Sequence, residues 1–143
     1  MSYYKGILSH NFPNQKWCTM ISKNNFNIDY KKLGGQFCSK YYSIHTNNYF
    51  NASYFFDNAC KITYNGYECY GYNMLLNKYK DLNITCFEYD LTEADCQPLK
   101  NELLINVIGK IRANQNNDII YNFSETFIIN CYYKISNYVF RIL

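Results

Sequence analysis

Hydrophobic and polar residues alternate along the last forty residues of the chain. Apolar side chains stand at every second position from Leu103 to Ile111, and a similar alternation runs from Tyr121 to Ile129. A third segment, from Tyr133 to Leu143, closes the chain. Alternation with a period of two residues is typical of strands with one buried face. We therefore predict three antiparallel strands here, in a curved sheet whose apolar face needs a cover.

Upstream of these strands, the apolar spacing changes to three and four residues. The residues with this spacing are Leu33, Phe37, Tyr41 and Ile44. Such a stripe predicts an amphipathic helix, and Asp29 is a suitable N-cap for it. The Gly34–Gly35 pair inside this helix costs about 1 kcal/mol per glycine relative to alanine. We therefore expect another element to pack closely against the helix at this point.

A β-hairpin is predicted in the middle of the chain. Two short β-prone runs, 60–64 and 67–70, flank the dipeptide Asn65–Gly66. This dipeptide favours a type I′ turn, because both of its positions need a positive φ. The other predicted elements in this region are short helices over 49–56 and 72–80, a strand over 84–92 and a turn at 95–98.

The predicted elements follow the order helix, helix, hairpin, helix and then long strands. This order indicates an α+β fold, a cone-shaped roll in which a curved antiparallel sheet carries about three helices on its concave face. A chain of 143 residues is long enough for one core of this kind. The polar, irregular residues 1–29 are predicted to form an N-terminal extension, and residues 30–143 to form the folded domain.

Composition and charge exclude several classes of partner. The net charge is +3, and the basic residues are scattered singly, so direct nucleic-acid binding is not expected. No segment reaches the length of an apolar membrane span, and the first twenty residues lack the apolar run of a signal peptide. We therefore expect a cytosolic or nuclear protein with no membrane contact, in which the cysteines are reduced.

The cysteine, histidine and acidic residues do not form a sequence pattern typical of a metal site or a catalytic site. The seven cysteines include no C-x-x-C pair and accompany only two histidines, so no metal site and no cofactor are predicted. An enzyme of this shape needs a carboxylate or histidine aimed into the cone as general base. His10 and His45 are not expected to point inward, and Glu88 and Asp90 are expected to face solvent. We therefore predict no catalytic residue and no enzymatic activity.

Five short motifs, in order along the chain, resemble the nuclear transport factor 2 family. They are Phe37-x-x-x-Tyr41-Tyr42, Thr63-Tyr-Asn-Gly66 followed by Gly71, Val107-Ile-Gly109, Phe123-Ser-Glu-Thr-Phe127 and Asn137-Tyr-Val-Phe140-Arg141. The resemblance covers residues 30–143. It implies a domain that dimerises sheet to sheet and engages Phe-Gly repeats of the nuclear pore. It also implies passage between nucleus and cytoplasm through the pores of the nuclear envelope.

Two branches of that family compete as the better match. The import carrier is a homodimer that binds GDP-bound Ran through a pocket with an acidic rim. The mRNA export cofactor pairs with the related domain of a larger export receptor and lacks that rim. Here Asn65 and the amide-rich residues 113–117 replace the acids, and a neutral amide cannot form a charge-assisted pair with lysine. The export branch is therefore predicted, with Ran-GDP import and a peptide-binding scaffold as alternatives.

The predicted partner-binding residues lie on the hairpin and near the end of the chain. The resemblance implies that Arg141 forms a salt bridge across the dimer interface; the alternative is a surface arginine that serves only its own sheet. Tyr64 and Asn65 are expected at the mouth of the pocket, and the alternative for Tyr64 is a core aromatic. The residues expected on the outer face of the sheet, in contact with the second chain, are Tyr133, Ile135 and Tyr138.

Overall fold

The computed structural model describes residues 29–115 and 117–143. All but the last residue of the predicted extension therefore lies outside the described residues. The helices are α2 (Tyr30–Asn47), the 3₁₀ helix η1 (Tyr49–Phe55) and α3 (Tyr72–Asp81). The strands are β1 (Phe56–Tyr64), β2 (Tyr67–Tyr70), β3 (Phe87–Pro98), β4 (Leu103–Ala113), β5 (Tyr121–Ile129) and β6 (Ile135–Ile142). The predicted helices and hairpin are confirmed, with small differences at their ends.

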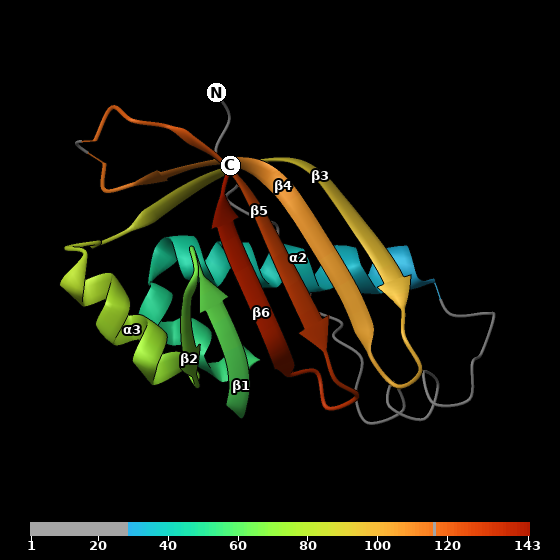
Figure 1. Ribbon diagram of the computed structural model, residues 1–143. Helices are drawn as coiled ribbons and strands as arrows, with labels where there is room; N and C mark the ends of the chain where they lie inside the picture. Colours follow the sequence, from blue (N-terminus) through green and yellow to red (C-terminus); the bar gives the residue numbers. More distant parts are fainter. Residues whose placement is uncertain (1–28, 116) are drawn as a thin grey trace.

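One sheet contains the six described strands in the order β2-β1-β6-β5-β4-β3. Neighbouring strands are antiparallel except for β1 and β6, which run parallel. Figure 1 shows the long strands β3 to β6 curving in front of α2, with α3 beside the β1–β2 hairpin. The helices and the bent sheet form an α+β roll, which confirms the predicted fold class.

Helix α2 forms and docks as its sequence pattern predicts. The Asp29 carboxylate caps the first turn by accepting a hydrogen bond from the Lys32 N–H at 3.0 Å. Phe37 and Tyr41 of the apolar stripe are both buried. Full burial of a large apolar side chain contributes roughly 1.5–3 kcal/mol. The stripe therefore holds the helix on the inner side of the sheet.

The two adjacent glycines of α2 differ in their surroundings. A Cβ added at Gly34 would lie 2.6 Å from the Cys96 Sγ, so a side chain there would clash with β3. A Cβ added at Gly35 would meet no atom within 4 Å. The close approach predicted from the pair is therefore confirmed at Gly34 alone.

The β1–β2 hairpin has the predicted tight turn. Asn65 and Gly66 have φ values of 48° and 86°, as a type I′ turn requires. The Asn65 N–H donates to the Phe140 carbonyl at 2.9 Å, and its side-chain oxygen accepts from the Ile142 N–H at 2.7 Å. The turn is thereby fastened to the end of β6.

Strand β3 is longer than predicted and ends at Pro98, so the turn predicted at 95–98 is wrong. A register shift between Leu91 and Glu93 interrupts the alternation of the strand. Beyond that shift most of its side chains are exposed, and an exposed polar run looks like a turn in the sequence. The chain turns at 99–102 instead.

Aromatic rings fill most of the core between α2 and the sheet. The largest fully buried side chains are Tyr41, Tyr42, Tyr79, Tyr89, Tyr138, Phe37, Phe55, Phe123, Phe127 and Phe140. Around Phe127, for example, the rings of Tyr41 and Phe37 lie at 4.9 and 5.3 Å in edge-to-face geometry. Pairs of this kind contribute about 0.5–1.5 kcal/mol beyond the area they bury.

None of the described helices is both long enough and apolar enough to cross a membrane. Among residues 29–115 and 117–143, no three His, Cys, Asp or Glu side chains are grouped so that they could hold a metal ion. The free thiols in this part of the chain are Cys38, Cys60, Cys69, Cys86 and Cys96. Cys131 is disulfide-bonded, so the prediction of reduced cysteines is wrong at that position.

Candidate functional site: the uncovered sheet face

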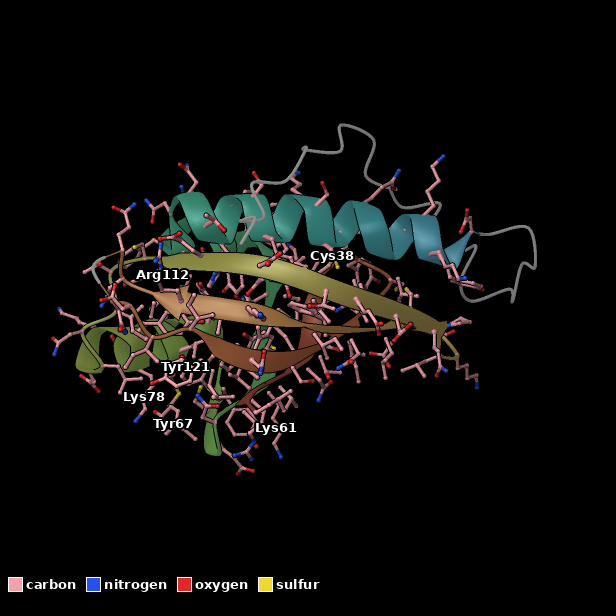
Figure 2. The ribbon with its side chains drawn as sticks, turned by 90° about the horizontal axis from the view of Figure 1, so that it is seen from above. Cys38, Lys61, Tyr67, Lys78, Arg112 and Tyr121 are labelled. Carbon is pink, nitrogen blue, oxygen red and sulfur yellow. The ribbon has the colours of Figure 1, made fainter. Side chains whose placement is uncertain are left out.

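No described element covers the outer face of strands β3 to β6. Helix α2 packs against the opposite face, along one side of the strands in Figure 2, and α3 and η1 pack beside the hairpin. The outward-pointing residues of the three inner strands are Leu104, Asn106 and Ile108 on β4, Ser124, Thr126 and Ile128 on β5, and Asn137, Val139 and Arg141 on β6. We call this surface the outer face.

The centre of the outer face combines apolar side chains with a fixed polar network. Val139 on β6 is 46 % exposed and stands opposite Thr126 of β5. The Asn106 amide donates to the Thr126 hydroxyl at 2.8 Å and to the Ser124 hydroxyl at 3.2 Å. These lateral bonds orient the polar groups at the centre of the outer face.

Arg141 lies exposed on the outer face. The salt bridge found among the described residues joins Arg112 to Glu88 at 2.9 Å. Arg141 therefore has no ionic partner in this part of the chain. A guanidinium group beside exposed Val139 is well suited to pair with a carboxylate of a second chain.

The last strand places two of the predicted partner-binding residues inside the protein. Ile135 and Tyr138 are 0 % and 1 % exposed, so their predicted position on the outer face is wrong. Ile135 and Tyr138 are three positions apart, so regular alternation would place them on opposite faces of the sheet. A register shift in the pairing of β5 with β6 lets both point inward. Tyr133 precedes the strand, is half-buried, and its ring packs 5.9 Å from that of Phe37. It does not lie on the outer face either.

Aromatic side chains of the protein itself fill the cone next to the predicted pocket mouth. Tyr64 is 7 % exposed and stacks on Phe140, with the ring centroids 4.9 Å apart. Phe140 in turn stacks on Phe123 at 5.7 Å, and Tyr79 packs edge-on against Tyr64 at 5.5 Å. Tyr64 is therefore a core aromatic, as in the alternative interpretation, and its burial raises its pKa to about 12.

The amides of the predicted neutral rim hold loops together. Asn65 fastens the hairpin turn to Ile142. The Asn114 side-chain oxygen accepts from the Thr85 N–H at 2.7 Å, and its amide donates to the Asn83 carbonyl at 3.0 Å. These contacts join the β4–β5 loop to the chain that follows α3. The two side chains have structural partners within the domain.

A buried carboxylate near the centre of the core is absent from the predictions. Glu125 is 0 % exposed and accepts hydrogen bonds from the hydroxyls of Tyr42 and Tyr138. Burial raises its pKa to about 7, although both hydrogen bonds lower it. The sequence does carry a signal for this burial. Glu125 stands midway between Phe123 and Phe127 on an alternating strand, so it shares their inward face.

His45 also points inward, so its predicted orientation is wrong. It is 1 % exposed, its Nδ1 lies 2.8 Å from the Tyr89 hydroxyl, and its ring stacks on Phe87 at 5.0 Å. Burial lowers its pKa to about 3. Glu88, expected to face solvent, is only half-buried and pairs with Arg112.

The buried polar groups do not make an accessible catalytic site. A general base must come within hydrogen-bond distance of the proton that it removes, and Glu125 and His45 are both enclosed. Three surface grooves lined by described residues contain neither side chain. The outer face is therefore the better candidate for function.

Comparison with known protein families decides the family. Residues 33–142 match the model of the Nuclear transport factor 2 (NTF2) domain. The chain belongs to the NTF2 domain family. The resemblance seen in the five motifs is thus confirmed.

Solved structures with the same fold support this assignment. Nuclear transport factor 2 from Cryptosporidium parvum has a TM-score of 0.68 and 23 % identity, and the match covers 83 % of this chain and 98 % of that one. The yeast UBP3-associated protein BRE5 has a TM-score of 0.68 and 17 % identity, with 82 % and 98 % covered. Orange Carotenoid Protein from Anabaena, binding canthaxanthin, has a TM-score of 0.64 and 15 % identity, with 75 % and 36 % covered. Among curated proteins, no sequence matches this chain.

Proposed function

We propose that this NTF2-domain protein is a non-enzymatic transport adaptor that pairs through its outer face with a related domain. The partner is the domain of a larger mRNA export receptor or a second copy of the chain. The pair engages Phe-Gly repeats of the nuclear pore and moves between nucleus and cytoplasm through the nuclear envelope pores. The observation that carries this proposal is that no described element covers the outer face, on which Val139 is exposed and Arg141 forms no salt bridge with any described residue.

The outer face has the charge distribution that pairing requires. Arg141 lies on β6, whereas Glu93 and Asp95 are exposed on β3 at the other side of the sheet. In a symmetric pair the same patch serves both chains, so that a residue i contacts j and j contacts i. Crossing two such sheets face to face brings the basic strand of one towards the acidic strand of the other.

The filled cone favours the export branch over Ran-GDP import. An import carrier needs an open pocket for an aromatic side chain and acids at its rim. Here the rings of Tyr64 and Phe140 stack inside the cone, and Asn65 and Asn114 use their side chains for internal hydrogen bonds. Opening a pocket for Ran would break these ring contacts, and the binding free energy would have to offset that loss. Ran-GDP import is accordingly the second candidate.

A peptide-binding scaffold outside transport is the third candidate. The fold likeness to BRE5 favours it, since one solved structure with a TM-score of 0.65 and 18 % identity is the yeast complex of the deubiquitinase Ubp3 with its Bre5 cofactor. That protein is thus an NTF2-like fold that serves as the cofactor of another protein. A domain of the same shape in this chain is suited to the same kind of role.

The deciding experiment combines molecular mass with three binding assays. Size-exclusion chromatography with light scattering measures the mass of the chain alone and after mixing with the export receptor's related domain. Calorimetry measures binding to Ran-GDP and to a Phe-Gly repeat peptide. A heterodimer together with Phe-Gly binding is the expected result. Tight Ran-GDP binding by a homodimer would replace the proposal with the import carrier.

Failure of every pairing would favour the scaffold. A chain that stays monomeric with the export receptor's domain, and binds neither Ran-GDP nor the Phe-Gly peptide, would overturn the transport proposal. A fluorescent fusion provides an independent test of location. Accumulation at the nuclear rim is expected, and exclusion from the nuclear rim would count against passage through the pores.

A further inference from the structure

A groove of about 500 Å³ lies between α2 and the second half of β3, away from the outer face. The residues that line it are Lys31, Gly34, Gly35, Ala94, Asp95, Cys96, Gln97 and Ile105. Four of these, two glycines, one alanine and one cysteine, have small side chains or none. The groove therefore exists because the facing walls of the helix and the strand carry little bulk.

Gly35 has no structural reason to be glycine. Gly34 must lack a side chain because Cys96 packs against it, but a Cβ at Gly35 would meet no atom within 4 Å. A glycine inside a helix destabilises the helix by about 1 kcal/mol relative to alanine. Glycine also permits the close approach of a ligand to the backbone. Gly35 thus leaves the helix wall of the groove open to an occupant.

The strand wall of the groove is a sheet edge that is free within residues 29–115 and 117–143. Among the described strands, β3 is the last in the sheet order, with β4 as its one neighbour. Ala94 pairs with the buried Val107 and so points to the inner side, yet it is exposed because α2 leaves it uncovered. Apart from the ladder with β4, the backbone of residues 92–97 makes no hydrogen bond within the described residues. Unpaired strand edges are templates for an added strand.

Charge indicates which kind of strand the edge accepts. Glu93 and Asp95 are exposed on this half of β3 and form no salt bridge with any described residue. Lys31 is the one cation among the residues that line the groove. The edge as a whole is therefore acidic and favours a partner with basic residues, while the apolar wall at Ile105 favours a large apolar side chain.

We propose that the groove binds an extended basic peptide that adds as a strand to the free edge of β3 and inserts one large apolar side chain over Gly35. Strand addition supplies main-chain hydrogen bonds, and the groove and Asp95 supply selectivity. The bulge between Leu91 and Glu93 and the proline at position 98 limit the edge at both ends. The groove lies between β3 and α2, and Asp95 borders both the groove and the outer face. The peptide proposal does not depend on the proposed transport role.

Fluorescence anisotropy tests the proposal with a labelled peptide that alternates valine and lysine around a central leucine. Wild type is expected to bind this probe, and Gly35→Leu to weaken binding by roughly tenfold or more by filling the groove. Gly35→Ala, which adds one methyl group, is the matched control and is expected to weaken binding far less. Circular dichroism confirms folding of both variants, for which the open space at Gly35 leaves room.

Charge variants test the edge independently. Asp95→Lys is expected to weaken binding roughly tenfold, whereas Glu68→Lys, on the opposite edge strand β2, is expected to leave it unchanged. A probe with glutamate in place of lysine is expected to bind at least roughly tenfold more weakly. Three results would each overturn the proposal: no binding by wild type up to roughly 1 mM, unchanged binding by Gly35→Leu, or equal binding of the acidic probe.

Gly35→Leu separates this site from the outer face. Light scattering of Gly35→Leu is expected to give the mass of wild type. A lower mass would show that a second copy occupies the groove and would contradict the peptide proposal. Loss of pairing at the outer face, with intact probe binding, would contradict the transport proposal alone.

Discussion

Glu125 on β5 and Tyr138 on β6 share a hydrogen bond at the centre of the core. The second carboxylate oxygen accepts from Tyr42 of α2, so one buried acid joins the helix to two strands of the sheet. Removing a charge from water is costly unless it is paired or becomes neutral. The neutral form of Glu125 is therefore favoured in the fold, and protonation becomes a determinant of stability.

Stability is expected to fall as pH rises through neutrality. Burial raises the pKa of Glu125 from 4.5 to about 7, so its favourable contribution is fully present below pH 4.5 and is lost as pH rises through about 7. Up to about 3 kcal/mol is at stake. Urea unfolding between about pH 5 and about pH 8 measures this loss.

Glu125→Gln is expected to flatten that dependence, because an amide keeps the shape without a titrating proton. Glu93→Gln, at an exposed position on β3, serves as the control and is expected to follow wild type. If Glu125→Gln lost as much stability as wild type over this range, another group would be responsible.

His45 is expected to act in the opposite direction. Burial lowers its pKa from 6.5 to about 3, so its contribution is fully present above pH 6.5 and is lost as pH falls towards 3. His45→Phe leaves the Tyr89 hydroxyl without its partner and costs about 1–3 kcal/mol at neutral pH. Thermal melts from about pH 7 down to about pH 4 are expected to bring the two proteins closer together on acidification. A constant difference would contradict the assignment.

Charge reversal on the outer face is expected to prevent pairing. Arg141→Glu and Val139→Asp each place an anion on the surface proposed to meet a second chain, and a buried unpaired charge is unfavourable there. Light scattering is expected to show monomer or aggregate in place of dimer. Lys80→Glu, at an exposed site on α3, is the control and should keep the mass of wild type. Unchanged mass for both outer-face variants would rule out this interface.

The hairpin turn is expected to need asparagine for two separate reasons. Asn65→Ala puts a Cβ-bearing residue without a polar group at a φ of 48° and removes the acceptor for the Ile142 N–H. A loss of about 1–3 kcal/mol is expected in urea unfolding. Asn65→Gly relieves the backbone and loses only the hydrogen bond, so it is expected to cost less. Equal losses would show that backbone strain does not contribute.

Neighbouring glycines in α2 are expected to respond in opposite ways. Gly34→Ala brings a methyl group to within 2.6 Å of the Cys96 Sγ, and overpacking of this kind costs about 1–3 kcal/mol. Gly35→Ala meets no atom and is expected to stabilise the helix by about 1 kcal/mol. Thermal unfolding of both variants measures the contrast. Cys96→Ala is expected to rescue Gly34→Ala in part, and no rescue would mean that other contacts cause the loss.

Local patterns predicted most of the fold. The spacing of Phe37 and Tyr41 marked the main helix, Asn65–Gly66 marked the hairpin turn, and alternation marked β4 and β5. Each of these signals depends on residues close together in the chain.

Predictions failed where a residue's environment depends on distant segments. A register shift against β5 turned Ile135 and Tyr138 inward. His45 stands four residues after Tyr41, so helix periodicity does indicate its inward position, but its contacts with Tyr89 and Phe87 arise only from the packing of α2 on β3. The bulge in β3 interrupts the alternation of apolar and polar residues, so the second half of that strand was not predicted from the sequence.

The sequence by itself determined the elements, their order and the family, because hydrophobic period and turn chemistry act over a few residues. Only the tertiary structure decided which hydroxyls contact Glu125 and His45, that aromatic rings fill the cone, and that Gly35 opens a groove beside a strand edge. Those features arise from the packing of segments far apart in the chain. Register shifts and ring contacts between these segments determine which side chains of each strand are exposed to solvent. They therefore determine which residues remain available to a partner.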